Sequence, residues 1–209
     1  DTITQRIYEV PNFLTKINLL GELLSQEEFS RVIIFVRTKT NADNVYKFIL
    51  RKISDSVRVI HGNKAQNTRL NSINDFKNGD VKVLVATDVA ARGIDVTLVS
   101  HVINFDVPII YEDYVHRIGR TGRANNQGIA ITFVNEAEKH HIGEIEKIID
   151  KKINNFPIPE GVVIEKTPFI EKQTMLREID FRRRKVDPDY MGAFHDKKIK
   201  THKSPKKRR

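Results

Sequence analysis

Five short runs rich in β-branched residues recur along the chain, and stretches with helical spacing separate them. The runs are almost continuously apolar, which is typical of strands buried on both faces of a parallel sheet. They are RVIIFV (31–36), SVRVIH (56–61), VKVLVA (81–86), VSHVINF (99–105) and GIAITFV (128–134), and QRIYEV (5–10) could add an edge strand. The helical stretches cover 13–25, 40–53, 66–79 and 137–152, and Gly79 is a plausible C-cap of the third. This alternation predicts an α/β three-layer sandwich with a mostly parallel sheet and right-handed crossovers.

Polar residues directly follow four of the predicted strands. In open α/β sheets, ligands bind beyond the carboxyl ends of the strands. The residues at these ends are Arg37, Thr38, Lys39, His61, Gly62, Thr87, Asp88 and Asp106. We therefore expect one edge of the sheet to carry the function.

Charge divides the chain into a neutral body and a basic tail. The 209 residues have a net charge of +9, and residues 182–209 alone, with 12 Lys/Arg and 3 Asp/Glu, account for all of it. Such a segment buries too little apolar surface to fold by itself. It suits a sequence-tolerant nucleic-acid tether, and a disordered, solvated end is the alternative. Because FPIPEG (156–161) marks a break, we expect a domain over 1–160, a linker or partly ordered extension over 161–181, and the tail.

The composition narrows the class of protein further. The chain has no cysteine, so it can form no disulfide or thiolate metal site, and we expect no metal site in it. It contains no apolar run near 20 residues and no signal-peptide pattern. We expect a soluble, cytoplasmic monomer without a membrane partner. The chain begins with Asp rather than Met, which suggests a fragment whose upstream part is missing.

The segment VATDVAARGID (85–95) joins a predicted strand to a helical turn. Asp88 can cap a short turn that runs to Arg92, which leaves outward-facing amides suited to a phosphate. Gly93 can close this turn in a backbone conformation that other residues avoid. In the alternative interpretation the polar residues are only caps, with Asp95 capping the next segment.

The segment HGNKAQNTR (61–69) follows the next predicted strand end. Gly62 could let a sugar-phosphate chain approach the backbone closely, and Gln66 and Arg69 could contact that chain from the start of a helix. Alternatively, the glycine only makes a tight turn, both side chains face solvent, and His61 packs or caps.

The segment YVHRIGRTGR (114–123) places one histidine and three arginines around two glycines. Each glycine costs about 1 kcal/mol relative to alanine inside a helix, so helix stability does not explain Gly119 and Gly122. Arg120 and Arg123 are one helical turn apart and could present both guanidiniums on one side. Arginine forks bind phosphate oxygens and stabilise charge on a transferring γ-phosphate. A solvated basic helix is the alternative, which the glycines disfavour.

Together these segments resemble the motifs of DEAD-box RNA helicases. HRIGRTGR is similar to motif VI, TDVAARGID to motif V, VIIFVRTK to motif IV and HGNKAQNTR to the Gln-x-x-Arg element, in matching order across 31–134. His116 favours the DEAD-box group over the DEAH and RecQ-like groups, which typically carry glutamine there. The resemblance implies the second, C-terminal RecA-like domain of such an enzyme over about residues 1–160, and the short basic extension favours a bacterial source.

The same resemblance implies roles for individual residues. Arg120 and Arg123 would be the γ-phosphate fingers, and Asp95 would contact the ribose of ATP. His116 would belong to the interdomain network around the hydrolytic water, and Arg92 to the interdomain network. The remaining residues that match the family motifs would line the path of the RNA backbone, and they are Gly62, Gln66, Arg69 and Thr87.

Two elements that ATP hydrolysis requires are absent from this sequence, namely a G-x-x-x-x-G-K-[ST] phosphate loop and an Asp-Glu-Ala-Asp box. ATP and its Mg²⁺ would therefore be held mainly by the N-terminal RecA-like domain of the same protein. RNA would be bound through its sugar-phosphate backbone, without sequence preference, for local duplex unwinding. This chain alone would be inactive. A non-catalytic RNA-binding RecA-like module and another superfamily 2 nucleic-acid remodeller are the alternative functions.

Overall fold

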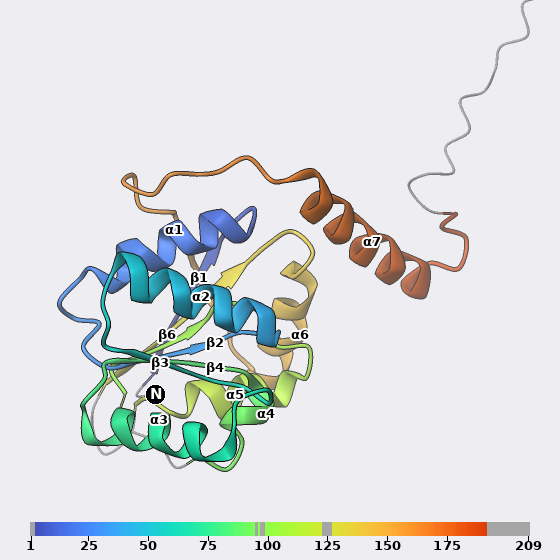
Figure 1. Cartoon of the computed structure of the whole chain (residues 1–209). Coiled ribbons are helices and arrows are strands. Elements are labelled where there is room, and N and C mark those ends of the chain that lie inside the picture. The colour runs from blue at the N-terminus through green and yellow to red at the C-terminus, as the bar shows by residue number, and fades with distance from the viewer. Residues whose placement is uncertain (1–2, 95, 97–98, 123–126, 192–209) are drawn as a thin grey trace, which may run out of the picture. The chain divides into compact units, whose positions relative to one another are not determined.

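A parallel sheet forms the centre of the computed structural model, which describes residues 3–94, 96, 99–122 and 127–191 (Figure 1). In this part of the chain the sheet has seven strands in the order β3-β4-β2-β5-β6-β1-β7, and every pairing is parallel. The strands are β1 (Ile3–Glu9), β2 (Val32–Phe35), β3 (Val57–Ile60), β4 (Val83–Ala86), β5 (His101–Asn104), β6 (Gly128–Val134) and β7 (Asn154–Phe156).

Helices cover both faces of this sheet (Figure 1). They are α1 (Phe13–Leu24), α2 (Lys39–Lys52), α3 (Gln66–Asn78), α4 (Asp88–Ala91), α5 (Tyr111–Ile118) and α6 (Lys139–Ile149). Successive residues of β2 point to opposite cores, because Val32 and Ile34 pack with α1 and α2 while Ile33 and Phe35 pack with Phe76 of α3. A further apolar cluster joins α5 and α6 to the second face. The predicted three-layer α/β fold is confirmed.

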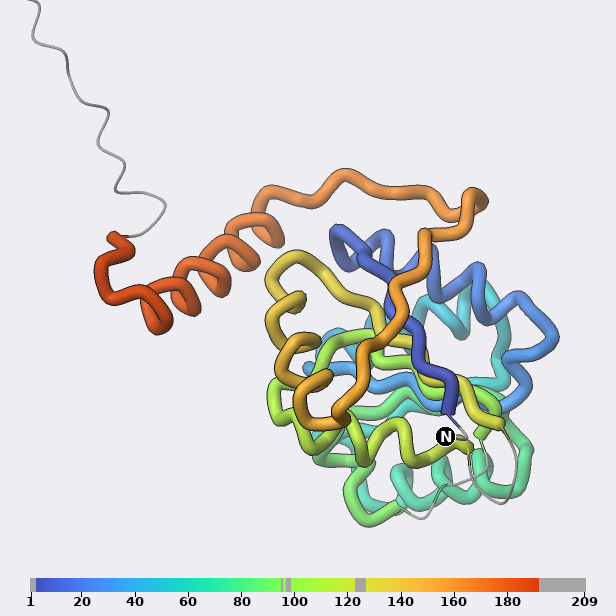
Figure 2. Tube along the Cα trace, turned by 180° about the vertical axis from the view of Figure 1, so that it is seen from behind, coloured from blue at the N-terminus to red at the C-terminus, as the bar shows by residue number. Residues whose placement is uncertain are grey.

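The outermost strand on one side of the sheet differs from the prediction. The strand expected over 5–10 is not an edge strand, because β7 pairs with β1 from Arg6 to Tyr8. All three residues of β7, NNF, are exposed, so the sequence carries no apolar run that would indicate a strand there. Figure 2 shows this segment running beside β1 from the opposite side.

The compact unit continues to Thr167, beyond the predicted boundary at residue 160. The segment after β7 packs along α1 because the amide of Asn18 donates to the Val163 carbonyl (2.9 Å). The backbone nitrogen of Glu165 donates to the hydroxyl of Thr15 (2.9 Å). These bonds and the buried Val162 make the segment part of the domain.

A second unit begins at Pro168 and contains α7 (Phe169–Val186). None of the residues of α7 is buried. The first five residues of the predicted tail, 182–186, are the end of this helix, and residues 192–209 lie outside the described residues. Among the helices that the structure describes, none has the length and hydropathy needed to cross a membrane.

Candidate functional site

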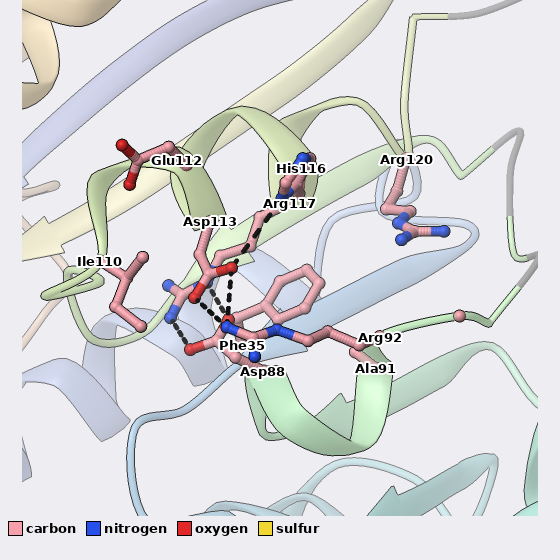
Figure 3. Close-up of a pocket in the computed structure, with 11 residues that line it drawn as sticks. Phe35, Asp88, Ala91, Arg92, Ile110, Glu112, Asp113, His116, Arg117 and Arg120 are labelled. Carbon is pink, nitrogen blue, oxygen red and sulfur yellow. Dashed lines mark hydrogen bonds and ion pairs between the residues drawn. The ribbon is translucent and has the colours of Figure 1, made fainter.

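A cleft of about 560 Å³ lies between α4 and α5 at the carboxyl end of the sheet (Figure 3). Three arginines and three carboxylates line it together with apolar side chains such as Phe35 and Ile110. Figure 3 shows two arginine–carboxylate pairs on one side of the cleft and Arg120 set apart from them. This is the edge at which the sequence predicts the function.

Arg117 is the buried cation at the base of this cleft, with only 2% of its surface exposed. Its Nε and Nη2 donate to the two carboxylate oxygens of Asp88 at 2.6 and 2.7 Å. Its Nη1 donates to Oδ1 of Asn104 (3.1 Å) and to the carbonyl of Asp106 (2.8 Å). The guanidinium also lies over the ring of Phe35, 5.1 Å from the centroid. Arg117 therefore joins α5 to α4 and to the end of β5 rather than facing a ligand.

This pairing corrects one prediction and reveals a residue that the sequence analysis did not assign. Thr87, not Asp88, is the N-cap of α4, and the carboxylate that was expected to cap the turn binds Arg117 instead. The turn does close at Gly93, whose φ of +74° confirms the need for glycine. The burial of Arg117 has a sequence signal, because it lies between the buried Tyr114 and Ile118 on one helical face.

Asp113 holds the two predicted interdomain residues at the mouth of the cleft. Its carboxylate accepts hydrogen bonds from Nη2 of Arg92 at 3.0 and 3.2 Å, and Nδ1 of His116 lies 3.9 Å from it. The side chains of Arg92 and His116 are 57% and 74% exposed. Both therefore remain accessible to a partner, and Asp113 is a site residue that the sequence analysis did not identify.

Arg120 lies after the end of α5, which finishes at Ile118. Its Nη1 donates to the carbonyl of Ile94, in the connection between α4 and β5. Thr121 forms a parallel bridge with Val99, and Gly122 has a φ of +67°. The prediction that Arg120 and Arg123 are separated by one helical turn is therefore wrong, because the backbone between them is not helical. Arg123 and Asp95 themselves lie outside the described residues.

The predicted RNA contacts lie beyond the carboxyl ends of β3 and β4, around the start of α3. Gly62 and Gln66 are exposed, and Nη1 of Arg69 donates to Oε1 of Gln66 (3.2 Å). Ala65 is the N-cap of α3 and provides no side-chain cap, so this helix offers its first-turn amides to a ligand. Thr87 is buried, and its nitrogen donates to the carbonyl of Ile60 (3.3 Å), just before this segment. The structure thus brings the four residues to one side of the sheet edge.

His61 is a packed histidine, as one of the alternatives for this segment expected. It is 2% exposed, its Nδ1 accepts from the nitrogen of Asn63 (3.3 Å), and its Nε2 lies 3.1 Å from Oδ1 of Asp43. Burial alone would raise the pKa of Asp43, but hydrogen bonds from His61 and Lys64 outweigh it and lower the pKa. His61 therefore orders the loop beneath Gly62.

Two polar residues at the strand ends serve an internal charge cluster, which we define as Lys16, Arg37, Asp106 and Glu138. Nζ of Lys16 lies 2.8 Å from Oε2 of Glu138 and 3.3 Å from Oδ1 of Asp106. Nη2 of Arg37 lies 2.7 Å from Oε1 of Glu138, and its backbone nitrogen donates to Oδ2 of Asp106 (2.9 Å). The cluster joins α1, the loops after β2 and β5, and the residue before α6.

The charges of this cluster are mutually compensated. Burial would lower the pKa of Lys16, but the carboxylates of Glu138 and Asp106 together raise it above its ordinary value. Burial would raise the pKa of Asp106, but Lys16 and the backbone and side chain of Arg37 lower it. The sequence analysis did not identify Lys16 or Glu138, since neither follows a predicted strand.

Comparisons with known proteins show the family to which this chain belongs. The family described as "Helicase conserved C-terminal domain" matches residues 15–125. The chain is 43% identical over 157 residues to the DEAD-box ATP-dependent RNA helicase RhpA of Helicobacter pylori, which covers 75% of this chain and 32% of that protein. The chain thus spans about a third of the length of this curated relative.

Solved structures give the same result. A structure of the E. coli DEAD-box protein SrmB bound to RraA has a TM-score of 0.71 and 38% identity, covering 79% of this chain and 97% of that chain. S. cerevisiae Dbp5 bound to RNA and ADP BeF3 has a TM-score of 0.69 and 36% identity, covering 77% and 43%. The chain belongs to the DEAD-box helicase family and corresponds to the C-terminal RecA-like domain of these proteins. A bacterial source stays a prediction.

Proposed function

We propose that this domain is the half of an ATP-dependent RNA helicase that supplies arginine fingers for ATP hydrolysis and part of the RNA-backbone surface for duplex unwinding. One observation carries the proposal, namely that Arg120 lines the cleft between α4 and α5 at the carboxyl edge of the sheet. The hydrogen bond from its Nη1 to the Ile94 carbonyl orients the guanidinium before a nucleotide binds. Preorganised donors of this kind stabilise charge that develops in a transition state.

In this proposal ATP supplies the γ-phosphoryl group that is transferred to water. Arg120 and Arg123 donate hydrogen bonds to the oxygens of that group, and Asp95 contacts the ribose. His116 and Arg92, exposed at the mouth of the cleft, contact the N-terminal RecA-like domain, which holds Mg²⁺ and most of the nucleotide. In the part of the chain that the structure describes, no group of three or more His, Cys, Asp or Glu side chains could hold a metal ion.

Exposed apolar side chains on α4 and just before α5, the two helices that border the cleft, support docking of that second domain. Val89 of α4 is 74% exposed, and Ile109 and Ile110, which precede α5, are 60% and 50% exposed. Exposed apolar residues grouped beside polar ones are typical of interaction surfaces. Closure of the two domains over the cleft would bury them and bring Arg120 to the nucleotide.

RNA would lie beyond the carboxyl ends of β3 and β4, around the start of α3. The proposal places its sugar-phosphate backbone against Gly62, Gln66 and Arg69, where the first amides of α3 and a cationic fork can bind phosphates. Thr87 is 6% exposed and would act mainly through the local backbone. Contacts of this type carry no base information, so binding would be independent of sequence. The relative Dbp5, solved with both RNA and ADP BeF3, supports both ligands.

The test uses the complete two-domain enzyme. We expect Arg120→Ala to lower RNA-stimulated ATP turnover by about 10³-fold or more, the range of arginine fingers. Arg120→Lys should restore little, since a point charge does not replace the planar fork. RNA affinity should change little. Arg51→Ala, on the exposed surface of α2, is the matched control. Near-normal turnover in Arg120→Ala would contradict the proposal. If DNA stimulated ATP turnover as strongly as RNA, the alternative of another superfamily 2 nucleic-acid remodeller would be favoured.

A further inference from the structure

The segment that carries Arg120 lies directly against the first residue of β6. A Cβ atom built on Gly128 would overlap the amide nitrogen of Gly122 and the side chain of Thr121, well inside the 3.0 Å that real Cβ contacts respect. One of these three contacts is with a backbone atom and the other two are with a buried side chain, so neither group can move aside easily. Glycine at position 128 is therefore a requirement of this packing.

Thr121 ties the same segment to the connection before β5. The threonine is 1% exposed, and its hydroxyl donates to the Val99 carbonyl and lies 3.3 Å from the Ser100 carbonyl. A parallel backbone bridge joins Thr121 to Val99, and the nitrogen of Val99 donates to the carbonyl of Arg120 (3.4 Å). A buried hydroxyl without its acceptor costs free energy, so this arrangement is strongly specified.

These contacts enclose Arg120 from both sides. On one side its Nη1 donates to the Ile94 carbonyl, at the start of the connection in which the sequence places Asp95. On the other side Thr121 bonds to Val99, at the end of that connection. Immediately afterwards Gly122 turns the chain with a φ of +67°. The two segments that would face the nucleotide are thus held together at both ends.

We propose that Thr121 and Gly128 are positioning residues of the segment that carries Arg120. The Thr121 hydroxyl and the bare Cα of Gly128 together determine where Arg120 contacts the nucleotide. This inference rests on the proposed function. Both residues are buried, so we place their effect in the position of Arg120 and not in a direct contact with the nucleotide. Catalytic groups must be held within about 0.5 Å of their productive geometry, and a displacement of about 1 Å can cost about 10²-fold in rate.

The experiment compares isosteric substitutions in the complete two-domain enzyme. Thr121→Val removes the hydroxyl at constant shape, and Thr121→Ser retains it. We expect Thr121→Val to lower kcat for RNA-stimulated ATP hydrolysis about 10- to 100-fold, with KM for ATP and RNA affinity within about twofold, and Thr121→Ser to stay within about threefold of the parent. Gly128→Ala should lower kcat about 100-fold. Gly143→Ala, where an added Cβ meets nothing within 4 Å, is the control.

A double-mutant cycle separates positioning from mere stability. If Thr121 acts through Arg120, then Thr121→Val should have almost no further effect on kcat in the Arg120→Ala background. A lowered melting temperature with unchanged kcat well below that temperature would overturn the inference, as would additive losses in the cycle. If Gly128→Ala does not fold, the Thr121 pair still decides. Failure of Arg120→Ala itself to lower turnover would instead refute the proposed function.

Discussion

Lys16→Met removes a buried cation from the internal charge cluster and leaves two buried carboxylates with Arg37 as their remaining partner among the four residues. Breaking a buried ion pair by removing one partner costs about 3–5 kcal/mol. Here we expect the lower end, about 3 kcal/mol, because Glu138 keeps Arg37 and accepts from the nitrogens of Val107 (3.2 Å) and Asn135 (3.1 Å). At about 2–4 °C per kcal/mol for a domain of this size, the melting temperature should fall by about 10 °C.

The assay is urea unfolding of this chain at pH 7, followed by far-UV circular dichroism. The control is Lys147→Met, which breaks an exposed pair with Glu144 at the same 2.8 Å separation. That change should cost less than about 1 kcal/mol, since exposed pairs contribute little. Adding Glu138→Gln to Lys16→Met removes one of the two buried negative charges that lose Lys16 as a partner, and it should recover part of the loss. The reasoning is refuted if the two lysine variants are equally stable, or if the double variant is as unstable as the sum of the singles.

Four further predictions follow from the site, a buried histidine, the tail and the missing motifs. Arg117→Lys should destabilise the domain by about 2–4 kcal/mol in thermal unfolding, since a lysine cannot bind Asp88, Asn104 and the Asp106 carbonyl together. Burial lowers the pKa of His101 to about 4, below its ordinary 6.5, so only the unfolded chain takes up this proton between those values. Stability should be full above about pH 6.5 and fall toward pH 4 in urea unfolding, and His101→Phe should flatten that slope. Removing residues 182–209 should weaken RNA binding equally for unrelated sequences and reduce its salt dependence in filter binding, whereas an unchanged salt slope would mean that the tail does not contact RNA. This chain alone should bind ATP at millimolar Kd or weaker, about −4 kcal/mol, in calorimetry and should show no RNA-stimulated phosphate release, which micromolar affinity would disprove.

The sequence by itself determined the fold class and predicted where the candidate site lies. Strands buried on both faces must be continuously apolar, so runs such as VIIF of β2 and VLVA of β4 are recognisable from a few neighbouring residues. Gly79 and Gly93 mark turns with positive φ for the same local reason. The polar residues after the strands predicted that the function lies at the carboxyl edge of the sheet, since all parallel strands end there.

Only the tertiary structure decided which of those polar residues pair with each other and which stay exposed. Lys16 and Glu138 are 122 positions apart, and Arg117 and Asp88 are 29 apart, so no local pattern shows that they pair. The same holds for Gly128, whose need for a bare Cα comes from Thr121 and Gly122 lying against it. Conformational preference acts over a few residues of chain, whereas charge compensation and steric exclusion act through space. The partners of a buried charge or a glycine therefore become known only when the chain has folded.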